Sequence, residues 1–172
     1  MDLRSVLIMF MHATRMVLSE LPSSLFPQET EAESHSNFSI REVDGVPYET
    51  LMGMFTKDFC RRMLEQSKKE LWDTTNDSVD RLPQYTIDVW DHGRVENHNL
   101  WEMLEPELGR VRERLNERFP DQARSLDWVF IRKYSQGEKR DRLQAHKDVS
   151  TLSVIIPLNS PPDYGGGELF FV

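Results

Sequence analysis

The chain of 172 residues lacks several features that would define its class directly. It has a single cysteine, Cys60, which excludes an intramolecular disulfide framework and a cysteine-based zinc site. It also lacks a cluster of basic residues, and 21 Lys and Arg against 29 Asp and Glu give a formal charge of −8. This acidic balance argues against nucleic acid or an anionic membrane surface as the main partner.

Long apolar runs are also missing. The stretch Val6 to Met11 is interrupted by His12 and Arg15, far short of the roughly 20 apolar residues of a membrane-spanning helix. We predict that residues 1–37 are a poorly structured N-terminal segment, either an amphipathic helix, a degenerate targeting peptide or a misassigned start. No clear signal peptide is present, so the compartment, cytoplasmic or endoplasmic reticulum, stays open.

The chain does contain enough large side chains for a packed core, with 4 Trp and 9 Phe. Thr56 is a predicted N-cap for a helix that runs to about Trp72. A second helix is predicted from Leu104 to Phe119, with Pro106 in its first turn or at a kink before it. The first helix has one apolar stripe at helical spacing, formed by Phe59, Cys60, Met63, Leu64 and Leu71.

Several segments alternate or are rich in β-branched and aromatic residues, which predicts strands. Helices come mainly before strands along the chain, so the predicted class is α+β. The predicted strands are Phe38 to Val43, followed by a turn at Asp44-Gly45, then Gln84 to Trp90, Trp128 to Ile131, Thr151 to Leu158, and Glu168 to Val172, with a hairpin loop over residues 159–167.

His146 and Asp148 form the strongest candidate for a chemical site. Side chains two positions apart on an extended chain project to the same side, so an imidazole and a carboxylate at this spacing can bind one metal ion. With one more His they make the facial triad of non-haem Fe(II) oxygenases. Composition alone supplies about one such triplet by chance, and an exposed polar strand edge is the alternative interpretation.

The surrounding sequence favours the metal site. Residues 128–172, WVFIRKYSQGEKRDRLQAHKDVSTLSVIIPLNSPPDYGGGELFFV, resemble the 2-oxoglutarate- and Fe(II)-dependent dioxygenases of the prolyl and lysyl hydroxylase superfamily. An aromatic strand ending at Tyr134, the H-x-D pair, the strand to Leu158 and the GGGELFF hairpin come in the order of that family. The resemblance extends over about residues 50–172, and its pattern is closest to the lysyl hydroxylase catalytic domain.

This resemblance implies N-terminal helices followed by a partial double-stranded β-helix (jelly roll). It also implies Fe(II), 2-oxoglutarate as co-substrate, ascorbate, and hydroxylation of a prolyl or lysyl side chain in a peptide or protein. His146 and Asp148 match the first two iron ligands. Tyr134 matches a position that often hydrogen-bonds 2-oxoglutarate, although a core tyrosine explains it equally well. Ser153, on the following strand, is predicted to face the same pocket.

The chain departs from the family pattern at its end. The family has a distal His and then an Arg or Lys that pairs with 2-oxoglutarate, but no His follows His146 and no basic residue follows Lys147. We therefore expect residues 38–172 to be the N-terminal part of a dioxygenase domain, incomplete and inactive in this form. The alternative is a non-catalytic interaction module derived from such an enzyme. The other histidines are all upstream, at His12, His35, His92 and His98.

Overall fold

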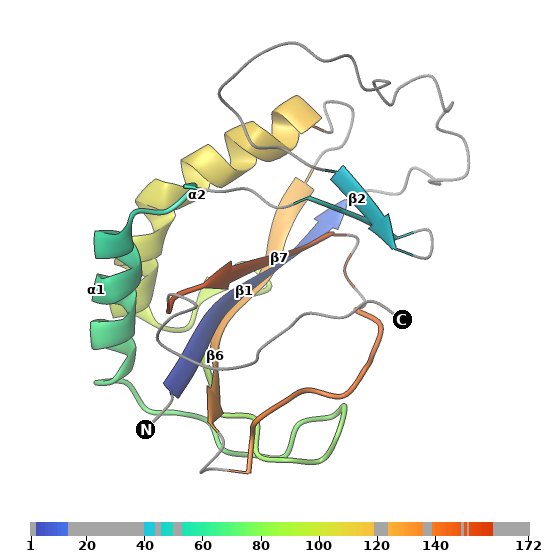
Figure 1. Cartoon of the computed structure of the whole chain (residues 1–172). Helices are drawn as coiled ribbons and strands as arrows, with labels where there is room; N and C mark the ends of the chain where they lie inside the picture. The colour runs from blue at the N-terminus through green and yellow to red at the C-terminus, as the bar shows by residue number, and fades with distance from the viewer. Residues whose placement is uncertain are drawn as a thin grey trace.

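A computed structural model describes residues 3–13, 40–43, 46–49, 53–118, 124–135, 139–148, 150 and 152–159. Its centre is a five-stranded antiparallel sheet in the order β5-β4-β6-β1-β7, with helices on one side (Figure 1). The sheet strands are β1 (Leu3–Ala13), β4 (Thr86–Asp91), β5 (Arg94–Val95), β6 (Arg124–Ser135) and β7 (Leu152–Pro157). A separate two-stranded sheet pairs β2 (Ile40–Val43) with β3 (Val46–Glu49).

The N-terminal segment differs from its prediction. Residues 3–13 form a strand rather than an amphipathic helix, and this strand lies between β6 and β7 (Figure 1). A short continuous apolar run cannot be assigned to helix or strand from periodicity alone. The β-branched and aromatic residues of this run favour the strand. The rest of the predicted segment 1–37 lies outside the described residues.

The first helix, α1 (Lys57–Ser67), begins where the sequence predicts. The Thr56 side chain accepts a hydrogen bond from the Phe59 backbone N–H at 3.1 Å, which satisfies one of the unpaired donors of the first turn. The helix ends earlier than the predicted Trp72. The chain turns after Ser67, and Leu71, predicted on the apolar stripe, is 93% exposed.

The second helix, α2 (His98–Arg118), begins six residues before the predicted start. Asn97 caps it, because its side-chain oxygen accepts a hydrogen bond from the Leu100 backbone N–H at 3.0 Å. Pro106 therefore lies inside the helix, where it has no N–H to donate to the carbonyl of residue 102. Phe119, the predicted last residue, is outside the described part.

The strand predictions are confirmed for β4, β6 and β7, and in part for β2. A turn joins β4 to β5 through His92 and Gly93, both with positive φ, at 44° and 92°. Two positive φ values in a two-residue loop are typical of a type I′ hairpin, and glycine adopts this backbone without strain. Residues 160–167 of the predicted loop 159–167, the strand Glu168 to Val172 and the turn Asp44-Gly45 lie outside the described residues.

The main core lies between the helices and one face of the sheet. Alternate residues of the strands point into it, as the period of two requires. Both helices contribute their apolar stripes, and Figure 1 shows α1 and α2 on the same side of the sheet. The α+β class is thus confirmed. The core consists of Phe59, Met63, Ile87, Val89, Leu100, Leu104, Leu108, Val111, Leu115, Val129, Ile131, Ile156 and Leu158.

The opposite face of the sheet carries two of the predicted site residues, Ser153 and Tyr134. Strand register places Phe10 opposite both Trp128 and Ser153, so these three positions share one row across β6, β1 and β7. Tyr134 is six residues further along β6, on the same face, which corresponds to about 20 Å of strand. Ser153 and Tyr134 therefore lie near opposite ends of the strands on this face.

Candidate metal site and its buried neighbour

His146 and Asp148 come together in the structure. They lie on an irregular segment between β6 and β7 rather than on a strand, yet His146 Nε2 is 3.1 Å from Asp148 Oδ1. About one third of each side chain is exposed, 34% and 33%, so both groups are within reach of an ion from solvent. The backbone differs from the predicted extended chain, but the two groups converge.

The imidazole of His146 has a defined orientation. Its Nδ1 is 2.9 Å from the backbone carbonyl oxygen of Gln144. A carbonyl oxygen only accepts, so Nδ1 carries the proton in this contact. Nε2, which faces Asp148, then either carries a second proton or offers its lone pair to a cation. Metal-binding histidines commonly donate their other N–H to a backbone carbonyl in this way.

The carboxylate of Asp148 is also oriented by a neighbour. Ser153 Oγ, from the start of β7, donates a hydrogen bond to Asp148 Oδ2 at 2.5 Å. Ser153 in turn lies 3.1 Å from Ser150 Oγ. One oxygen of Asp148 thus faces β7 and the other faces His146. Ser153 joins the site, but its contact is with the carboxylate rather than with an open pocket.

The donor pair fits one divalent ion in part. Two ligands about 2.1 Å from an ion and 90° apart lie about 3.0 Å from each other, close to the observed separation. An imidazole nitrogen and a carboxylate oxygen also suit Fe(II). However, among the residues with a described position, no group of three or more His, Cys, Asp or Glu side chains could hold a metal ion.

Tyr134 is placed apart from this pair. Its charged neighbours are Arg132, Arg140 and Asp77, and it lies about 20 Å along β6 from the row of Ser153. Burial raises the pKa of the Tyr134 hydroxyl, and the nearby arginines work against that rise. Its role towards 2-oxoglutarate stays a prediction.

The upstream histidines with described positions lie in other settings. His92, in the β4–β5 turn, contacts Asp91 through Nδ1 and is 3.3 Å from Asp127 Oδ1 through Nε2. The hydrogen bond to Asp91, and then the charges of Asp127 and Asp91, raise the pKa of His92. His98 is the first residue of α2. His12 is on β1, where it pairs with Ser125 of β6, and His35 lies outside the described residues.

Sequence reasoning missed a buried ionic network. The side chain of Arg140 is 0% exposed, and its two terminal nitrogens are each 2.5 Å from a carboxylate oxygen, one of Asp77 and one of Asp80. Arg132, from β6, also reaches Asp77 Oδ2, at 2.9 Å. The sequence offers little signal for this, since Arg140 lies in the polar run EKRDR and both aspartates lie in a loop.

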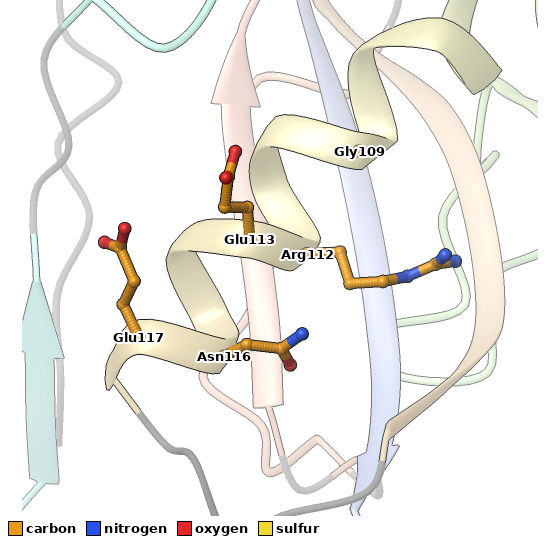
Figure 2. A pocket seen from close by; sticks show the side chains of 5 residues that line it. All are labelled: Gly109, Arg112, Glu113, Asn116 and Glu117. Atoms are coloured by element: carbon orange, nitrogen blue, oxygen red, sulfur yellow. The ribbon is translucent and has the colours of Figure 1, made fainter.

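A shallow hollow on α2 carries no comparable arrangement. It is lined by one helix only, and Figure 2 shows Glu113 and Glu117 turned to one side of that helix while Arg112 and Asn116 turn to the other. Gly109 lies one turn before Glu113. These groups do not converge on a common point, so the hollow is not a catalytic cleft.

Comparisons with known proteins do not identify a family for this chain. No protein-family model, curated protein or solved structure matches the chain. Within the described residues, no helix has both the length and the apolar character that crossing a bilayer requires.

Proposed function

We propose that this chain belongs to an Fe(II)- and 2-oxoglutarate-dependent dioxygenase, with His146 and Asp148 as two of the iron ligands. The observation that carries the proposal is the 3.1 Å separation of His146 Nε2 and Asp148 Oδ1, which matches two adjacent ligands of one ion. The Gln144 carbonyl supports it, because it leaves Nε2 as the nitrogen available to the ion.

Within this proposal the protein groups have distinct roles. Bound Fe(II) would supply the activation of dioxygen, coupled to conversion of 2-oxoglutarate to succinate. His146 and Asp148 hold the ion. Ser153 orients the Asp148 carboxylate by donating a hydrogen bond to Oδ2, the oxygen that does not face His146. The five-stranded sheet would form one sheet of a double-stranded β-helix, and ascorbate would keep the iron reduced. A peptide or protein side chain, prolyl or lysyl, is the proposed substrate.

The ligand set needs at least one more donor. The facial triad has three protein ligands, and the described residues bring two together. A two-ligand site binds its ion more weakly than a three-ligand site, so we expect weak metal binding and little or no turnover from His146 and Asp148 alone.

Metal binding is the first test. Titration of the chain with Mn(II), followed by electron paramagnetic resonance of the free ion, should detect one weak site that His146→Ala abolishes. His92→Ala is the matched control, since His92 is an exposed imidazole that also contacts a carboxylate. Equal Mn(II) binding by the wild type and His146→Ala would remove His146 from the site and contradict the proposal.

A non-catalytic interaction module is the second candidate. The observation that favours it is the lack of a three-ligand group among the described residues. Succinate formation from 2-oxoglutarate, measured with Fe(II) and ascorbate, separates the two candidates. Fe(II)-dependent succinate that is lost in His146→Ala supports the enzyme, whereas metal binding without any succinate supports the module.

A further inference from the structure

The buried Arg140 connects two loops that are distant in sequence. Asp77 and Asp80 lie in the loop before β4, and Arg140 begins the segment that leads to His146. The Arg140 main chain is also fixed, because its carbonyl oxygen accepts a hydrogen bond from the Ser135 N–H at 2.7 Å. Arg140 is therefore held at the end of β6 by both its backbone and its side chain.

Asp80 continues this connection toward the candidate metal site. Besides Arg140, its carboxylate accepts a hydrogen bond from the Leu82 backbone N–H at 3.1 Å, and the Gln144 N–H lies close enough to help lower the pKa of Asp80. The carbonyl oxygen of Gln144 is the group that contacts His146 Nδ1 at 2.9 Å. One residue, Gln144, thus lies between the two groups, with its N–H acting on Asp80 and its C=O contacting the imidazole.

We propose that Asp80 and Arg140 are positioning residues for His146. Arg140 fixes the Asp80 carboxylate, Asp80 fixes the backbone of Gln144, and the Gln144 carbonyl binds Nδ1 of His146 so that Nε2 faces Asp148. This inference rests on the proposed function for the identity of the ion, but the orientation of the imidazole does not depend on any ion. Mutation of outer groups that orient a ligand imidazole typically lowers metal affinity by about 10-fold to 100-fold.

Asp77 helps to separate positioning from plain stabilisation. It binds Arg132 of β6 as well as Arg140, so it ties its loop to the sheet directly. The contacts of Asp80 run instead to its own loop and to the segment 140–144. A loss of the Asp80 contacts should therefore disturb His146 more than it disturbs the sheet.

Two conservative variants test the proposal in the folded full chain. Arg140→Lys keeps the charge but loses the two-pronged geometry, and Asp80→Asn keeps the shape but loses the charge that orders Arg140. Arg142→Lys is the control, because that side chain is on the same segment and 82% exposed. Near-ultraviolet circular dichroism of the tryptophans identifies the temperature range in which each variant stays folded.

The first readout needs no metal. Nitrogen-15 NMR of the histidine rings should show a protonated Nδ1 on His146, the nitrogen that contacts the Gln144 carbonyl, in the wild type and in Arg142→Lys. In Arg140→Lys and Asp80→Asn we expect a mixture of tautomers. An unchanged His146 signal in both folded variants would overturn the positioning role.

The second readout is the Mn(II) affinity. We expect a loss of about tenfold to 100-fold in Arg140→Lys and Asp80→Asn, and no change in Arg142→Lys. Wild-type affinity in both folded variants would also overturn the positioning role. Absence of Mn(II) binding by the wild type would overturn the proposed function instead, and the tautomer measurement would still decide the role of Asp80 and Arg140.

Discussion

The two ends of the segment from residue 139 to residue 148 hold their charged groups in opposite ways. At one end, the guanidinium of Arg140 is fully buried between two carboxylates. At the other end, the side chains of His146 and Asp148 are about one-third exposed, and His146 Nε2 faces Asp148 Oδ1. Buried charges need partners of opposite charge because their desolvation is costly, whereas exposed donors can remain available for a ligand. The segment thus joins a rigid anchor to an open pair of donors.

The largest effect should come from breaking the anchor. Asp77→Ala leaves two buried guanidinium groups, those of Arg132 and Arg140, without their shared carboxylate. Removing one partner of a buried ion pair typically costs about 3–5 kcal/mol of unfolding free energy. Urea denaturation monitored by tryptophan fluorescence measures this loss.

An exposed carboxylate provides the control for that experiment. Asp58, in the first turn of α1, also pairs with two arginines, Arg61 and Arg62, at 2.5 and 3.1 Å, but it is open to solvent. Asp58→Ala should change the urea midpoint little, because water and salt screen exposed pairs. A similar loss in both variants would mean that burial does not distinguish the two networks.

Two aspartates should respond to acid with opposite sign. Burial works to raise the pKa of Asp80, but the hydrogen bonds from Leu82 and Arg140 outweigh it and lower the pKa below its usual 3.8. The unfolded chain then binds this proton more readily than the folded chain. The stabilisation by Asp80 is therefore fully present above about pH 3.8 and is lost as the pH falls through the lower folded-state pKa.

Asp88, on β4, is the counterpart. Burial, together with the charges of nearby carboxylates, raises the pKa of Asp88 above 3.8, although the Trp128 Nε1–H donates a hydrogen bond to it at 2.9 Å. Its ionisation therefore costs stability as the pH rises from 3.8 through the raised pKa, and the cost is fully present above that pKa.

The matched pair Asp88→Asn and Asp80→Asn sharpens this contrast. At pH 7, Asp88→Asn should raise the melting temperature, since asparagine still accepts from Trp128 without carrying charge. Asp80→Asn should lower it. Both differences should shrink as melting is followed down to pH 3, and equal signs for the two variants at pH 7 would contradict the assignment.

The sequence predicted those elements whose signals are local. The Thr56 cap precedes a clear apolar stripe, and the strand from Trp128 to Ile131 is rich in aromatic and β-branched residues, so both were found. Residues 3–13 were assigned wrongly, because a continuous apolar run fits a buried strand and a helix equally well. The early start of α2 was missed because Pro106 was expected near a helix start.

The candidate site shows the same difference between contacts that are local in sequence and contacts that are distant in sequence. His146 and Asp148 are two residues apart, so their proximity could be predicted from spacing alone. The pairing of Arg140 with Asp77 and Asp80 spans about 60 residues and depends on how two irregular loops meet. Periodicity carries no information on such a contact, and polar residues in loops are read as solvated by default.

The smallest change in stability should come from the open end of the segment. His146→Ala removes a partly exposed imidazole whose contacts are Gln144 and Asp148, and substitutions at such surface positions usually stay within about 0.5 kcal/mol of the wild-type unfolding free energy. The same variant should lose Mn(II) binding altogether. If His146→Ala loses Mn(II) binding but keeps its stability, the imidazole serves the ligand rather than the fold. A loss as large as that of Asp77→Ala would instead place His146 among the groups that hold the two loops together.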